Sequence, residues 1–120
     1  EGRVNQSGEK YIAYLFATVA GVSKVGSYSG NSGTQTIDCG FSSGARFVLI
    51  KRTDQAADWK VYDTVRGIVA GNDPELALNS NAAEVTGYDY IDPHSSGFII
   101  PIDNFNTNAS GGSYIFYAIA

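Results

Sequence analysis

The sequence has 120 residues and a net charge of −4, with 43% hydrophobic and 17% charged residues. This length and apolar content predict one soluble folded domain and exclude intrinsic disorder. The eight Lys and Arg residues form no basic stripe, which excludes nucleic-acid binding through phosphates and docking on an acidic membrane surface. A single Cys and a single His exclude an internal disulfide and metal sites built from several of either residue.

The first strand-like segment is Tyr11–Ala17, which is apolar on both faces, as a central strand would be. The longest apolar run, Tyr11–Val22, is interrupted by Thr18 and Gly21 and falls short of the ~20 residues of a membrane-spanning helix. We therefore expect no membrane insertion. The absence of Met indicates a processed chain or a segment of a longer protein.

Turn signals rich in Gly, Ser, Asn and Asp separate the segments that follow, which is typical of an all-β fold. Strands are expected where β-branched and aromatic residues dominate: Thr34–Cys39, Arg46–Arg52, Trp59–Arg66, Leu76–Leu78, Phe98–Ile102 and Tyr114–Ile119. Helical patterns are weak and limited to Asp73–Leu78 and one turn at Ser80–Val85. The sequence thus predicts an antiparallel β-sandwich, jelly-roll or lectin-like, with roughly 7–9 strands and little helix.

The two ends of the chain are similar to each other. Val4–Ala17 reads VNQSGEKYIAYLFA and Thr107–Ala120 reads TNASGGSYIFYAIA, with seven of fourteen positions identical at an offset of 103 residues. Such an offset indicates a repeated unit of about a hundred residues. We expect residues 1–17 to be the closing strand of a preceding unit, or a strand exchanged between copies, and residues 18–120 to form one β-sandwich domain. Residues 1–17 and 104–120 should then form equivalent strands.

Three stretches carry a family resemblance. They read VSKVGSYSGNSGTQTIDCGF at Val22–Phe41, ARFVLIKRT with WKVYDTVRG at Ala45–Thr53 and Trp59–Gly67, and NASGGSYIFYAIA at Asn108–Ala120. Together they resemble a tandem-repeat domain of structural proteins in tailed bacteriophages. The resemblance implies a virion component on an extracellular particle, either a tail-fibre or appendage module or a capsid-surface module. It also implies symmetric oligomers, and it supplies no catalytic motif.

No set of residues indicates catalysis, so we expect no enzymatic activity, no cofactor and no metal. Cys39 is expected to be a buried free thiol, and His94 is the only imidazole that could activate it. The paired acids of a glycosidase are not evident, because the acidic residues cluster in turns, where capping explains them. The loop carboxylates Asp89, Asp92 and Asp103 are of the type that calcium prefers but match no EF-hand spacing.

Two aromatic groups are candidate glycan sites, because sugars stack on exposed rings beside polar side chains. The first comprises Trp59, Tyr62 and Arg66, and the second comprises Tyr88, Asp89 and Tyr90. Packing in the core or in a subunit contact is the alternative for both groups, since Trp59 alternates in phase with Val61.

The sequence leads to two hypotheses for function. The first is a non-enzymatic virion structural protein that assembles with other copies of itself and with other virion proteins. Its expected assembly residues are the apolar residues shared by the repeated strands: Tyr11, Ile12, Tyr14, Tyr114, Ile115 and Tyr117. The alternative is a receptor- or glycan-binding module on the same particle, with a host surface glycan as partner. Exposure of the aromatic groups would favour binding, and their burial in a subunit contact would favour assembly.

Overall fold

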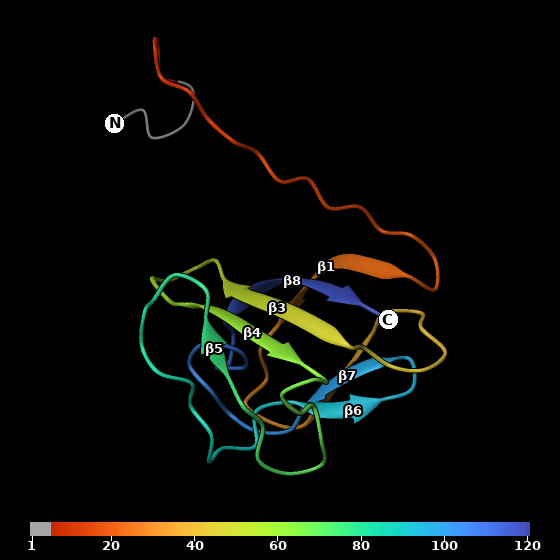
Figure 1. Ribbon diagram of the computed structural model, residues 1–120. Helices are drawn as coiled ribbons and strands as arrows, with labels where there is room; N and C mark the ends of the chain where they lie inside the picture. Colours follow the sequence, from red (N-terminus) through yellow and green to blue (C-terminus); the bar gives the residue numbers. More distant parts are fainter. Residues whose placement is uncertain (1–5) are drawn as a thin grey trace.

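A computed structural model describes residues 6–120 (Figure 1), which contain eight strands and no helix. The strands are β1 (Ser23–Ser29), β2 (Gln35–Asp38), β3 (Phe47–Arg52), β4 (Trp59–Asp63), β5 (Leu76–Ala77), β6 (Asp92–His94), β7 (Gly97–Ile100) and β8 (Ser113–Ile119). The prediction of an all-β sandwich is confirmed.

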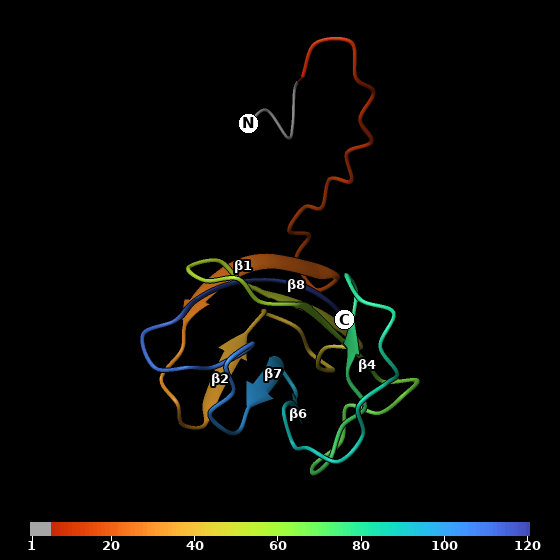
Figure 2. The same cartoon turned by 90° about the vertical axis from the view of Figure 1, so that its left-hand side faces the viewer.

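The strands form two antiparallel sheets that face each other (Figure 2). The larger sheet has the order β1-β8-β3-β4-β5, and the smaller sheet has the order β2-β7-β6. Strand β8 pairs with β1 along seven residues and with β3 along six, which makes it the central strand of the larger sheet. Its inward residues are buried, whereas its outward residues are partly buried or exposed although most of them are apolar.

The core lies between the two sheets and is filled by alternate residues of each strand. Its buried members from the strands are Ile37, Val48, Ile50, Tyr62, Phe98, Ile100, Tyr114, Phe116 and Ala118. Phe116 of β8 meets Phe98 of β7 edge-on, with ring centroids 5.6 Å apart, and so joins the two sheets. On β1, a Cβ at Gly26 would lie 2.6 Å from the Phe116 ring, so this position must be glycine for the ring to fit.

The two predicted helical segments are wrong, because neither forms a helix. Asp73 does not cap a helix; its carboxylate accepts hydrogen bonds from the backbone N–H groups of Val69 and Ile91, which hold two loops together. Leu76–Ala77 pairs with β4 as strand β5, and Ser80–Val85 contains no helical turn.

Some predicted strands are also bounded differently. Strand β4 ends at Asp63, because the Asp63 carboxylate accepts hydrogen bonds from the N–H groups of Val65 and Arg66 and so forms a turn. Strands β1 and β6 lie outside the segments in which the sequence predicts strands.

The predicted strand Tyr11–Ala17 is not formed: residues 6–17 lie outside both sheets, and most of the segment extends away from the sandwich (Figures 1 and 2). The segment leaves the domain beside β1, above the outer face of the larger sheet. Of the N-terminal repeat copy, Val4 and Asn5 lie outside the described residues.

Candidate functional site

The outer face of the larger sheet is apolar. The residues that alternate with the core positions of β1, β3, β4 and β8 point away from the smaller sheet, and most of them are hydrophobic: Val25, Phe47, Leu49, Trp59, Ile115, Tyr117 and Ile119. Val25 is 43% exposed and Ile115 is 41% exposed. The solvent face of an antiparallel sheet usually carries polar side chains, so this composition marks a contact surface.

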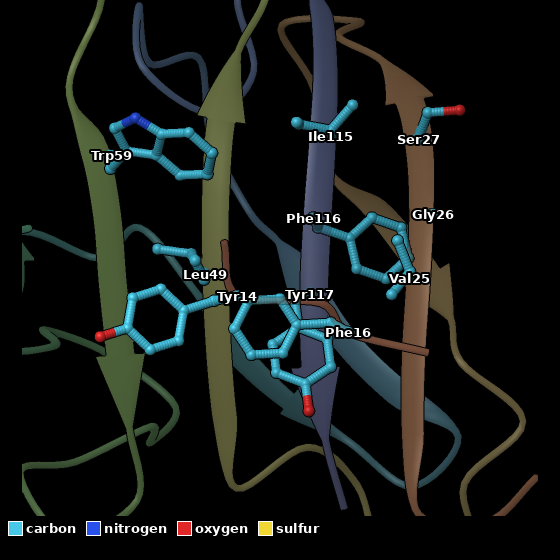
Figure 3. A pocket seen from close by; sticks show the side chains of 10 residues that line it. All are labelled: Tyr14, Phe16, Val25, Gly26, Ser27, Leu49, Trp59, Ile115, Phe116 and Tyr117. Atoms are coloured by element: carbon cyan, nitrogen blue, oxygen red, sulfur yellow. The ribbon is translucent and has the colours of Figure 1, made fainter. Parts of the chain in front are cut away.

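The part of the N-terminal segment that adjoins the domain lies over this face, where Tyr14 and Phe16 complete a groove of about 490 Å³ (Figure 3). Tyr14 and Phe16 form one wall above side chains of β1, β3, β4 and β8. The Phe16 ring stacks on Tyr117 with centroids 4.4 Å apart, and Tyr117 meets Phe47 edge-on at 6.4 Å. None of the lining residues has a carboxylate, an amine or an imidazole. The groove is therefore suited to apolar contact rather than to acid–base chemistry.

Hydrogen bonds fix the point at which the segment leaves the domain. The N–H of Val25, on edge strand β1, donates to Thr18 Oγ1 at 3.1 Å. The Ser23 hydroxyl donates to the carbonyl of Ala17 at 2.8 Å, and Val19 forms a β-bridge with Ser23. The connection between residues 17 and 23 is thus an ordered turn.

The six predicted assembly residues divide into three groups. Tyr11, Ile12 and Tyr14 are exposed on the N-terminal segment, and Ile115 and Tyr117 lie on the outer face of the sheet. Tyr114, in contrast, is 1% exposed and belongs to the core of its own domain. Its hydroxyl donates to the carbonyl of Phe105, so it offers nothing to a partner.

The structure does not bring together the first candidate glycan group. Trp59 lies on the outer face of β4, whereas Tyr62 points into the core and is fully buried. Arg66 lies in the turn after β4 and forms an ion pair with Asp63, with Nη2 and Oδ2 2.8 Å apart. These side chains therefore line no common surface.

The side chains of the second candidate group lie together, but contacts within the domain bury part of their surface. The Tyr88 and Tyr90 rings stack at 5.1 Å with 8° between their planes. Tyr90 also packs against the core, while Tyr88 is 54% exposed. Burial raises the pKa of Asp89, with a further contribution from the charge of Asp92. The group offers a partner one open tyrosine face.

Cys39 is buried, and its Sγ lies 3.8 Å from the carbonyl oxygen of Ile37. Burial raises the pKa of the thiol to about 11, so it stays protonated at neutral pH. The Nδ1 atom of His94 lies 3.1 Å from the hydroxyl of Ser96. The environment of the thiol thus opposes its use as a nucleophile.

The acidic residues mainly serve structural contacts. Asp54 forms a two-point ion pair with buried Arg52, at 2.9 and 3.0 Å, and this hydrogen bonding lowers the pKa of Asp54. The Arg52 guanidinium also lies over the Phe105 ring at 4.5 Å. Over residues 6–120, no three His, Cys, Asp or Glu side chains are grouped as a metal site. In the same range, no helix has the length and hydrophobicity to cross a bilayer.

One buried polar cluster was not predicted from the sequence. Lys60 Nζ lies 2.7 Å from Glu75 Oε1, and the Tyr62 hydroxyl donates to the other carboxylate oxygen. Both charged side chains are buried. The alternation in β4 puts Lys60 on the same face as Tyr62, which is the one sequence signal that a buried countercharge is needed.

Comparisons with known proteins place the chain in a family without assigning a role. No curated protein matches the sequence, and no solved structure matches it. Over residues 1–120 the sequence matches the family described as "Domain of unknown function (DUF7483)", and the chain belongs to this family.

Proposed function

We propose that this domain is a non-enzymatic assembly module that acts through protein–protein contacts at the outer face of its five-stranded sheet. The observation that carries the proposal is the row of apolar side chains on that face, which a solvent-facing sheet does not need. Fully burying one large apolar side chain contributes about 1.5–3 kcal/mol. Covering several half-exposed ones therefore supplies several kcal/mol for association.

The resemblance to bacteriophage repeat domains extends the proposal to a biological setting. In that setting the domain is a virion structural protein, in a tail fibre, an appendage or the capsid surface. Its partners are other copies of itself and other virion proteins. A β-sandwich with an apolar contact face suits a building block of this kind.

Light scattering coupled to size exclusion tests the assembly role. We expect the mass of the native chain to rise with concentration, and the double variant Val25→Lys/Ile115→Lys to remain monomeric. Both residues are more than 40% exposed, so the variant should keep its fold. The matched control is Val65→Lys, which changes an exposed apolar residue away from the face. A native chain that stays monomeric, or a control that dissociates as completely as the double variant, would refute the proposal.

A second candidate function is glycan binding at Tyr88. The observation that favours it is the exposed face of the Tyr88–Tyr90 stack. A glycan array would then give a signal that Tyr88→Ala abolishes and Val65→Lys leaves unchanged. An array without signal removes this candidate and leaves the assembly role as it stands.

A further inference from the structure

The two copies of the repeated sequence begin with the same turn, although only one of them continues into a sheet. Gly8 and Gly111 occupy equivalent positions and both have positive φ, 85° and 70°. In each copy the residue after the glycine donates a backbone hydrogen bond to the carbonyl three residues earlier, at 3.2 Å in the first copy and 2.9 Å in the second.

In each copy, a tyrosine hydroxyl accepts a hydrogen bond from a backbone N–H of the turn. The backbone N–H of Gln6 donates to the hydroxyl of Tyr11 at 3.0 Å. The backbone N–H of Ala109 donates to the hydroxyl of Tyr114 at 2.9 Å. This bond spans five residues in both copies, so the similarity of the two segments extends from sequence to local structure.

After the turn, the C-terminal copy becomes β8, whose inward side chains are Tyr114, Phe116 and Ala118. The equivalent residues of the N-terminal copy are Tyr11, Ala13 and Leu15. Here they have no core to enter: Tyr11 is 50% exposed and Leu15 is 91% exposed. The segment thus has the local structure and apolar pattern of a closing strand, but the 18–120 sandwich already has its own.

We infer that residues 6–17 are the closing strand of a second domain of the same fold, which precedes residues 18–120 in the polypeptide. The inference rests on the proposed function, because it names the partner that covers the outer face of the sheet. A copy of the chain that already contains β8 has no vacancy for this strand. The recipient is therefore a domain that takes residues 6–17 as its own β8.

The contacts of the segment indicate how the two domains pack. Ile12, Tyr14 and Phe16 correspond to the outward positions of β8. Two of them, Tyr14 and Phe16, already line the groove on the outer face of the larger sheet (Figure 3). With residues 6–17 in place as a strand, the outer face of the second domain lies against the outer face of this one. The stack of Phe16 on Tyr117 is one contact of that sheet-on-sheet interface.

The core of the second domain must differ from this one near the strand. Ala13 stands where Phe116 fills the core, and Leu15 stands where Ala118 does. Because Gly26 is required only by the Phe116 ring, the second domain needs a larger residue at its equivalent of Gly26.

The test adds residues 18–103 ahead of residue 1 of the 120-residue chain, so that residues 1–17 follow the added segment as residues 104–120 follow residue 103. Hydrogen exchange then reports on the amides of residues 11–17. We expect these amides to be unprotected in the 120-residue chain and protected by about 10³-fold or more in the extended chain, since folded-to-unfolded ratios of small domains start near that value. The extended protein should remain a monomer.

Substitutions make the test specific. In the extended chain, Leu15→Asp should abolish protection of residues 11–17, whereas Lys10→Asp, at the position of exposed Ser113, should keep it. A second form carries Ala13→Phe and Leu15→Ala, which restore the inward residues of β8 if the core mismatch prevents folding. Protection in either form supports the inference, and its absence in both overturns it.

A third variant separates this inference from the proposed function. Adding Ile115→Lys to the extended chain should leave residues 11–17 protected while the two domains move apart, which small-angle scattering detects as an increased radius of gyration. If protection appears but Ile115→Lys changes no dimension, the closing strand is correct and the contact face is refuted. If protection never appears, the closing strand is refuted independently of the self-association measured on the 120-residue chain.

Discussion

Replacing Lys60 with Met should destabilise the domain severely. The ammonium of Lys60 and the carboxylate of Glu75 are 2.7 Å apart, and their side chains are only 10% and 4% exposed. The Tyr62 hydroxyl donates to the second carboxylate oxygen. Without the ammonium, the carboxylate stays buried with a single neutral donor. Breaking such a pair typically costs about 3–5 kcal/mol, which is a large part of the ~5–15 kcal/mol that stabilises a domain.

Stability should return when the other members of the buried cluster are replaced as well. The double variant Lys60→Met/Glu75→Leu removes both charges but leaves the Tyr62 hydroxyl without its acceptor, at a cost of about 1–3 kcal/mol. The triple variant with Tyr62→Phe also removes the hydroxyl. Its stability should approach that of the native chain, because replacing a complete buried ion pair by apolar side chains is often neutral or stabilising.

Urea unfolding followed by the fluorescence of Trp59, the single tryptophan, measures these differences. Arg66→Met is the matched control, since it breaks the ion pair with Asp63 in which the Arg66 side chain is 40% exposed. An exposed pair of this kind contributes at most about 1 kcal/mol. Two results would contradict this account of the buried pair. In the first, Lys60→Met lowers the free energy of unfolding by no more than Arg66→Met does. In the second, the triple variant is as unstable as Lys60→Met alone.

Three further predictions concern other buried groups. Cys39, with a pKa raised to about 11 by burial, should react with a disulfide reagent at pH 8 at least roughly a hundredfold more slowly in the native chain than in urea. Burial also raises the pKa of Asp73 from 3.8 to about 6, so the folded state binds the Asp73 proton more tightly than the unfolded state does. Lowering the pH from 7 to 4 should therefore stabilise the domain by up to about 3 kcal/mol, as measured by urea unfolding at each pH. The variant Asp73→Asn should lack this gain in stability. Below pH 4 a further decrease in pH should destabilise the domain instead. The hydrogen bond with Arg52 lowers the pKa of Asp54 in the folded state, and protonation of Asp54 breaks this ion pair. Gly26→Ala should cost about 1–3 kcal/mol in thermal unfolding, since the new Cβ meets the Phe116 ring; an unchanged melting temperature would contradict the packing described for β1.

The fold was predictable wherever strands combine alternation with β-branched and aromatic residues, as in β3, β4 and β8. Strand β1 was missed because SKVGSYS has a low strand propensity, yet it pairs with β8 along its whole length. Strand β6 was missed because Asp92–His94 contains Pro93, which lacks an N–H. The structure accommodates this proline at a sheet edge, where β6 pairs only with β7.

The interaction face was only half predictable. The alternation along β4 separates Trp59 from Lys60 and Tyr62, but the pattern alone does not say which set enters the core. Because Trp59 and Val61 are apolar, the sequence alone favours their side of the strand as the one that enters the core. The structure buries the side with Lys60, because Glu75, fifteen residues away, supplies the countercharge. That pairing depends on the antiparallel contact between β4 and β5, which no local pattern encodes.

The repeated segment shows where local sequence stops determining structure. Residues 6–11 and 109–114 form the same turn, because a glycine with positive φ and a tyrosine hydroxyl are sufficient to specify it. The segments that follow differ completely, since β8 pairs with a strand on each side and residues 11–17 pair with no strand of the 18–120 sandwich. A strand is specified by its partners as much as by its own residues. The exposed apolar pattern of residues 11–17 is therefore best explained by partners that belong to another domain.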